Sequence, residues 1–152
     1  MLQCEPELTY RVRTPLASDP TVGSPLAVTQ YWQISEASLD GPRIHATLVG
    51  TGGDWMRMTH DGFWRPDVRA QFVTDDGATV LMHYTGIIEQ TRAFTDAAAT
   101  DQATDWADQY MRLAIDFDTG DQRYAWTTQH LFVAAGRLLG TGHIDYDVRR
   151  IT

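Results

Sequence analysis

The sequence contains no lysine and no asparagine, and all twelve of its basic residues are arginine. The absence of lysine excludes Schiff-base chemistry, lysine-bound pyridoxal phosphate and a phosphate-binding loop that ends in lysine. A single cysteine, Cys4, excludes an intrachain disulfide and any metal site built from several cysteines. This cysteine usage favours a reducing, cytoplasmic location.

Long hydrophobic runs and basic clusters are also absent. No stretch reaches the roughly 18 apolar residues that would span a bilayer. The N-terminal stretch MLQCEPELTYRVR carries acids where a signal peptide would be apolar. The net charge is -8, and no basic stripe is present to bind phosphates. We therefore expect neither nucleic acid nor membrane as a partner.

The residues that are present describe a folded chain. Of the 152 residues, 43% are hydrophobic and five are tryptophan, which argues against disorder. This length suits one domain, residues 1–152, with a core of useful size.

Hydrophobic residues recur mainly with a period of two, which is typical of β-strands. Turn signals separate the candidate strands, among them SDP at 18–20, DDG at 75–77 and GTG at 140–142. The candidate strands are 7–13, 27–34, 43–49, 54–59, 66–74, 78–88, 110–117, 123–134 and 143–150. We predict an all-β protein: a single antiparallel, lipocalin-like (calycin-like) barrel of about 8–10 strands. One short helix or ordered loop is expected near 96–109, with Trp106 as its anchor.

The clearest hairpin joins strands 66–74 and 78–88. With Asp76-Gly77 as a two-residue turn, Arg69 faces Tyr84 and Gln71 faces Met82. One face would then carry Asp67, Arg69, Gln71, Val73, Val80, Met82 and Tyr84. Because this face mixes polar and apolar groups, it suits the lumen of a barrel that holds a ligand.

Several short motifs carry a resemblance to a known family. They are GGDW at 52–55, DVR at 67–69, TDDGA at 74–78, YTG at 84–86 and FDTGDQRYAW at 117–126. In this order they resemble the family named domain of unknown function 3237, which occurs in bacteria and fungi. The resemblance implies a compact, lipocalin-like antiparallel β-barrel over the whole chain and says little about function.

The chain departs from the family pattern in two regions. YWQISEASLDGP stands where the family has a Gly/Arg-rich segment. Asp118 replaces a family glutamate, and Trp126-Thr127-Thr128 replaces the family's WLN. Because these changes affect residues of the kind that line a pocket, we expect a specialised member of the family with its own substrate. A role in specialised metabolism would fit this expectation.

Asp67, Arg69 and Tyr84 are candidate catalytic residues. Asp67 and Arg69 lie two apart on one strand face, so they can pair or bind one polar ligand. Tyr84, predicted opposite Arg69, would complete the cluster. The alternative is a structural ion pair beside a packed tyrosine.

Asp54 is the fourth candidate catalytic residue. It follows a glycine pair that allows close backbone approach, and Trp55 could form the wall of a pocket. The alternative is an Asx-type turn in which Asp54 bonds its own backbone.

Further residues are candidates for substrate binding. Trp126, Thr128 and His130 share one face of the predicted strand 123–134, an aromatic, hydroxyl and imidazole row that suits an apolar ligand with polar handles. The complete set of substrate-binding candidates is Trp55, Gln71, Met82, Asp118, Trp126, Thr128 and His130.

The sequence predicts no cofactor and no metal. The five histidines have no HxH, HxxxH or HExxH spacing, no serine lies in a GxSxG elbow, and GTGGDW lacks the context of a dinucleotide site. His83, with Phe72 and Leu81, is predicted on an apolar second face, through which a homodimer could form.

Two classes of function fit this pattern. The first is a cofactor-independent enzyme that performs acid/base chemistry on an apolar, oxygenated small molecule: an isomerase, cyclase, dehydratase or epoxide-opening enzyme. The second is a lipocalin-like barrel that binds or carries a small molecule without changing it. Ionisable groups on a predicted inward face favour the enzyme, because a passive apolar carrier would avoid them.

Overall fold

The computed structural model describes residues 1–15 and 21–152, so the predicted turn at 18–20 lies outside the described residues. The elements in chain order are β1 (Cys4–Arg13), β2 (Thr21–Gly23), β3 (Ala27–Ile34), β4 (Glu36–Gly41), β5 (Ile44–Leu48), β6 (Gly52–Thr59), β7 (Phe63–Arg65), β8 (Asp67–Thr74), β9 (Thr79–Glu89), α1 (Arg92–Ala99), β10 (Met111–Asp118), η1 (Gln122–Gln129), β11 (Phe132–Gly140) and β12 (His143–Ile151).

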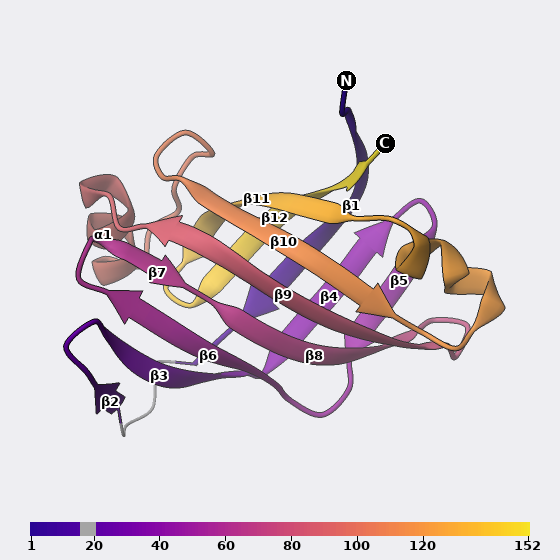
Figure 1. The fold of residues 1–152 in the computed structure, drawn as a ribbon, viewed down its shortest axis with the longest axis horizontal. Helices are drawn as coiled ribbons and strands as arrows, with labels where there is room; N and C mark the ends of the chain where they lie inside the picture. The colour runs from indigo at the N-terminus through magenta and orange to yellow at the C-terminus, as the bar shows by residue number, and fades with distance from the viewer. Residues whose placement is uncertain (16–20) are drawn as a thin grey trace.

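The strands form one antiparallel sheet that closes into a barrel (Figure 1). The sheet order is β10-β11-β12-β1-β4-β5-β8-β9-β7-β6-β3-β2, and a further pairing of β10 with β9 closes the ring. β3 runs into β4 and β5 into β6 after short bends, so the twelve segments amount to ten strands. The predicted single antiparallel barrel is confirmed. Within the described residues, the short strand β2 pairs only with β3 and lies at an edge beside the closed ring.

Eight of the nine predicted strands are present within three residues of their predicted limits. β10 shows why: Met111, Leu113, Ile115 and Phe117 are buried and the residues between them are exposed. Such alternation places one face in the core and the other toward solvent. The prediction missed the short or polar strands β2, β4 and β7, which have little hydrophobic alternation, and most of β11.

The predicted strand 123–134 is wrong, because residues 122–129 form the 3-10 helix η1 and β11 begins at Phe132. The Asp121 side chain caps η1 by accepting a bond from the Arg123 N–H at 3.0 Å. The Thr127 and Thr128 hydroxyls donate to carbonyls three residues earlier, at 2.8 and 2.9 Å. These local hydrogen bonds take the place of the hydrogen bonds that a strand would make with its neighbours. They therefore outweigh the period-two hydrophobic pattern that predicted a strand.

The β8–β9 hairpin differs from its predicted register by one residue. The turn has three residues, Asp75 to Gly77, so Arg69 pairs with His83 and Gln71 with Leu81. Gly77 adopts a positive φ of 89° within this turn. Because side chains alternate between faces, a shift of one residue moves each partner on β9 to the opposite face.

The helix α1 covers one end of the barrel, and η1 lies at the other end (Figure 1). α1 overlaps the start of the predicted 96–109 segment, and the remainder of that segment is irregular. Thr91 caps α1 through a bond from the Phe94 N–H at 3.1 Å, which turns Phe94 and Ala97 into the core.

Candidate functional site

Asp54 projects into the barrel from β6. Its neighbours Gly53 and Trp55 face outward, where the Trp55 ring lies 5.2 Å from that of Tyr31 and is 49% exposed. A Cβ at Gly53 would lie 2.5 Å from the Tyr31 ring, so glycine permits this outer aromatic pair. The predicted pocket wall at Trp55 is therefore wrong, because alternation puts Trp55 outside when Asp54 is inside.

The Asp54 carboxyl is buried, with 7% of the residue exposed. Its Oδ1 accepts one hydrogen bond from the backbone N–H of Asp67 at 3.0 Å. Burial raises the pKa of Asp54 to about 7, the Asp67 N–H opposes this rise, and the charge of Asp67 adds to it. At neutral pH the carboxyl can therefore act as an acid or as a base.

Asp54 lines an internal cavity of about 310 Å³ beneath α1. This volume is at the small end of the range for ligand pockets. The remaining lining is predominantly apolar and includes Trp32, Met56, Trp64, Ile88, Phe94 and Leu138. Trp32 and Trp64 pack against each other with ring centroids 6.0 Å apart. Among the lining residues that the structure describes, Asp54 is thus the one ionisable group in a mostly apolar wall.

Three buried tyrosines lie within electrostatic reach of Asp54. The Tyr10 and Tyr84 hydroxyls are 3.4 Å apart, and the Tyr10 ring stacks on Tyr146 with centroids 5.5 Å apart. Burial raises the pKa of all three phenols, and the negative charge of Asp54 raises it further. The phenols therefore remain protonated and can serve as neutral hydrogen-bond donors.

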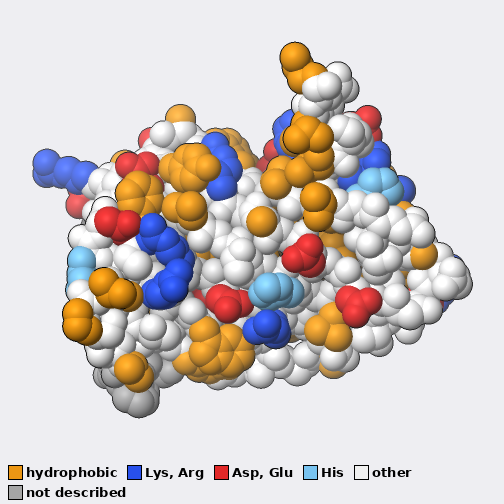
Figure 2. Space-filling view, in the orientation of Figure 1, with side chains coloured by type: hydrophobic (Ala, Val, Ile, Leu, Met, Phe, Trp, Pro, Cys, Tyr) orange, Lys and Arg blue, Asp and Glu red, His pale blue; other side chains and the backbone are white. Residues whose placement is uncertain are grey.

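The predicted cluster of Asp67, Arg69 and Tyr84 does not form. Tyr84 faces the core, while Asp67 and Arg69 face outward with side chains 46% and 60% exposed. Asp67 contacts Arg69 at 3.8 Å and His83 at 3.0 Å, and Figure 2 shows acidic, arginine and histidine side chains together on this outer face. The one-residue difference in the hairpin is the cause. The predicted register placed Tyr84 on the same face as Arg69, whereas the observed register pairs Arg69 with His83 and turns Tyr84 to the other face.

The other predicted binding residues also lie away from the cavity. Gln71 and Asp118 are exposed on the outer face, and Met82 is fully buried in the core. Phe72 is likewise in the core, so it does not share an outer face with Leu81 and His83 as predicted. The positions of Gln71, Met82 and Phe72 follow from the corrected pairing of β8 and β9.

Trp126, Thr128 and His130 do not form a row, because η1 replaces the predicted strand. The Arg43 guanidinium lies 3.7 Å from the centre of the Trp126 ring. The Thr128 hydroxyl bonds Ala125, and the His130 Nδ1 lies 2.8 Å from the Trp126 carbonyl. All three serve local structure at the end of the barrel opposite α1.

Sequence reasoning missed most of the chamber wall. Trp32 could have been found, because it lies on the predicted strand 27–34 and pairs directly with Asp54 across β3 and β6. Trp64 belongs to a three-residue strand, and Phe94 to a helix that starts earlier than expected. Neither Trp64 nor Phe94 lay in a segment whose hydrophobic periodicity predicted that its side chain would face the core.

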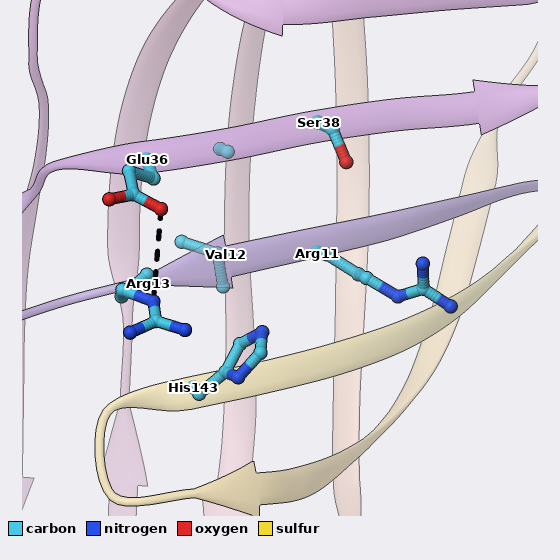
Figure 3. Close-up of a pocket in the computed structure, with 7 residues that line it drawn as sticks. Arg11, Val12, Arg13, Glu36, Ser38 and His143 are labelled. Atoms are coloured by element: carbon cyan, nitrogen blue, oxygen red, sulfur yellow. Dashed lines mark ion pairs between the residues drawn. The ribbon is translucent and has the colours of Figure 1, made fainter.

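A second depression lies on the outer face of β1, β4 and β12 (Figure 3). It carries Arg11, Arg13, Glu36 and His143. Arg13 pairs with Glu36 at 3.8 Å and Arg11 with Asp145 at 3.2 Å, and the side chains of Arg11, Arg13 and Glu36 are all more than half exposed. These charged side chains are solvated and paired with one another, whereas the chamber at Asp54 is mostly apolar and sheltered, so the chamber is the stronger candidate site.

Across residues 1–15 and 21–152, no three His, Cys, Asp or Glu side chains lie together in a way that could hold a metal ion. In the same part of the chain, every helix is too short or too polar to cross a membrane.

The fold and the chamber define the class: a small closed β-barrel with a cavity of ligand size that a buried carboxyl group, Asp54, lines. Within this class, the chain belongs to the family described as "Protein of unknown function (DUF3237)", whose model matches residues 5–151. The family resemblance read from the motifs is confirmed. No curated protein matches the chain in sequence.

Solved structures share the fold across the whole chain. A protein of unknown function from Rhodopseudomonas palustris superposes with a TM-score of 0.89 at 22% identity, covering 100% of this chain and 99% of that one. A β-barrel-like protein from Acinetobacter baumannii gives 0.80 at 21% identity, with 100% and 97% covered. A structure described as an enzyme from Penicillium herquei gives 0.69 at 16% identity, with 100% and 94% covered.

Proposed function

We propose that this protein is a cofactor-independent enzyme that uses Asp54 for acid/base chemistry on a small, apolar, oxygenated substrate. One observation carries the proposal: among the described residues of a mostly apolar chamber lining, Asp54 is the one carboxyl group, and its pKa is raised to about 7. Strongly shifted carboxyl groups in cavities are typical of catalytic sites.

The chemistry follows from the two oxygens of Asp54. Oδ1 is held by the Asp67 N–H, so the carboxyl group has a fixed orientation. Protonated, it can donate its proton to a substrate oxygen, and ionised, it can remove a proton from carbon or oxygen. Isomerisation, cyclisation, dehydration and epoxide opening need such transfers together with positioning in a closed chamber.

The likeness to the Penicillium herquei structure supports a catalytic role, since that protein is described as an enzyme. The alternative is a barrel that binds or carries its ligand without changing it, which the apolar lining would also suit. A carrier gains nothing from a buried carboxyl group, whose ionised form is costly to bury.

The test uses 5-nitrobenzisoxazole, an apolar probe of general bases. A base removes its ring C–H proton while the N–O bond breaks, giving a coloured cyanophenolate. We expect the wild type to release this product at a rate that rises with pH through about 7. We expect Asp54→Asn to lower the rate by about 100-fold or more.

Asp118→Asn is the matched control, because it removes the same charge from an exposed position on β10. It should keep the wild-type rate. Equal rates for the wild type and Asp54→Asn would contradict the enzymatic function and favour the carrier, whose binding would be measured by thermal stabilisation.

A further inference from the structure

Trp32, in the chamber wall, carries an unpaired hydrogen-bond donor. Its indole Nε1 is buried and has no hydrogen-bond partner among the described residues. A buried donor without an acceptor destabilises the fold unless something in the cavity satisfies it. Trp32 lines the same cavity as Asp54.

The strand register sets the two groups side by side. Trp32 on β3 is the direct cross-strand partner of Asp54 on β6. Side chains of directly opposed residues on one face of an antiparallel pair are close neighbours. Trp32 and Asp54 therefore lie together in the chamber wall, close enough for one small ligand to contact both.

The other polar groups at the chamber are already engaged. The hydroxyls of Thr14, Thr95 and Thr141 donate to the carbonyls of Gly142, Arg92 and Ala98, respectively. The Gln90 amide donates to the Ile88 carbonyl at 3.4 Å. Trp32 is thus the buried side-chain donor that has no partner at all within the described part of the chamber wall.

We infer that Trp32 is a substrate-positioning residue and that the chamber takes an uncharged, apolar molecule with an acceptor oxygen. The indole N–H holds that oxygen, and Asp54 exchanges a proton with the neighbouring part of the molecule. This inference rests on the proposed function, because it names the substrate class of the same site. An anionic ligand is disfavoured, since it would meet the Asp54 carboxylate in an apolar surrounding.

The experiment compares two probes of nearly equal shape, the ketone α-tetralone and the hydrocarbon tetralin. Calorimetry would measure their affinities for the wild type and for Trp32→Phe, which keeps an aromatic ring and removes the N–H. We expect Trp32→Phe to lower the preference for the ketone over the hydrocarbon by about threefold to tenfold.

Trp64→Phe is the matched control, because Trp64 is the neighbouring tryptophan of the wall and has no unpaired buried N–H. It should lower both affinities by a similar factor and leave the preference unchanged. In addition, the Trp32 indole resonance of ¹⁵N-labelled protein should shift with α-tetralone and not with tetralin.

Two results would overturn the inference: failure of α-tetralone to bind the wild type, or equal preference in the wild type and Trp32→Phe. The proposed function fails separately. If Asp54→Asn still removes the proton from 5-nitrobenzisoxazole at the wild-type rate, the catalytic role of Asp54 is contradicted. If Trp32→Phe nevertheless loses the preference for the ketone, Trp32 remains the hydrogen-bond donor to the ligand.

Discussion

Asp54 illustrates how much a single residue depends on its surroundings. On the outer face a carboxyl group stays hydrated, as does that of Asp67 on the adjoining strand β8, whose side chain is 46% exposed. Inside the chamber the Asp54 carboxyl group loses most of its hydration and keeps one backbone hydrogen bond. Burial therefore dominates, and the pKa rises.

This pKa predicts a particular pH dependence of stability. The folded-state pKa of Asp54 is about 7 and its ordinary value is 3.8, so the folded protein binds this proton more tightly than the unfolded chain. The contribution to the free energy of unfolding is complete below about pH 4, is lost as pH rises to about 7, and is on the order of 4 kcal/mol. The Asp54→Asn variant cannot ionise at this position, so its free energy of unfolding should lack this pH-dependent contribution.

Urea unfolding at pH 5 and pH 8 would measure it. Relative to the wild type, Asp54→Asn should be markedly more stable at pH 8 than at pH 5. A stability difference that is the same at both pH values would show that the Asp54 carboxyl titrates normally.

At the scale of an element, the β8–β9 turn decides which residues of these two strands face the core. Its three residues place Val68, Phe72 and Tyr84 inside, and a two-residue turn would have exposed one strand's core residues. Gly77 makes the longer turn possible, because its φ of 89° is a conformation that other residues rarely adopt.

We expect Gly77→Ala to destabilise the fold by about 1 kcal/mol. Gly77→Asn should cost less, because asparagine tolerates positive φ better than alanine. Urea unfolding would rank the two variants. Gly120→Ala is the control, since this glycine has open space around it and no positive φ, and it should leave stability nearly unchanged. Equal effects at the two glycines would contradict the role of the turn.

At the scale of the whole molecule, a buried carboxylate joins distant parts of the chain at the end of the barrel opposite α1. Glu7 on β1 accepts two bonds from Arg43, at 2.8 and 2.7 Å, and one from Arg150 on β12 at 3.1 Å. Arg43 also covers the ring of Trp126 in η1. The bonds from Arg43, followed by its charge and those of Arg150, hold the pKa of Glu7 below its usual value against the effect of burial.

Glu7→Gln should therefore destabilise the protein by about 1–3 kcal/mol at pH 7. Because the folded-state pKa of Glu7 is lowered, its contribution is present above pH 4.5 and is lost as pH falls through the folded-state pKa. The difference between the variant and the wild type should shrink in acid, as thermal unfolding would show.

Glu36→Gln serves as the control, because the Glu36–Arg13 pair has both side chains more than half exposed. Its effect should stay below about 0.5 kcal/mol at any pH. A similar loss for both variants would show that Glu7 contributes no more than a surface ion pair.

The sequence by itself determined the class of fold, the family and most strand positions, because alternating hydrophobicity depends only on neighbouring residues. It also singled out Asp54. It could not place the site correctly, because β8 and β9 have mixed polarity on both faces and only the turn length decides which face is inside. Local capping in η1 likewise overrode the pattern that had placed Trp126 in a strand. The chamber itself was decided by tertiary structure alone: Trp32, Trp64 and Phe94 come from separate elements, and the raised pKa of Asp54 results from the apolar enclosure that they create together.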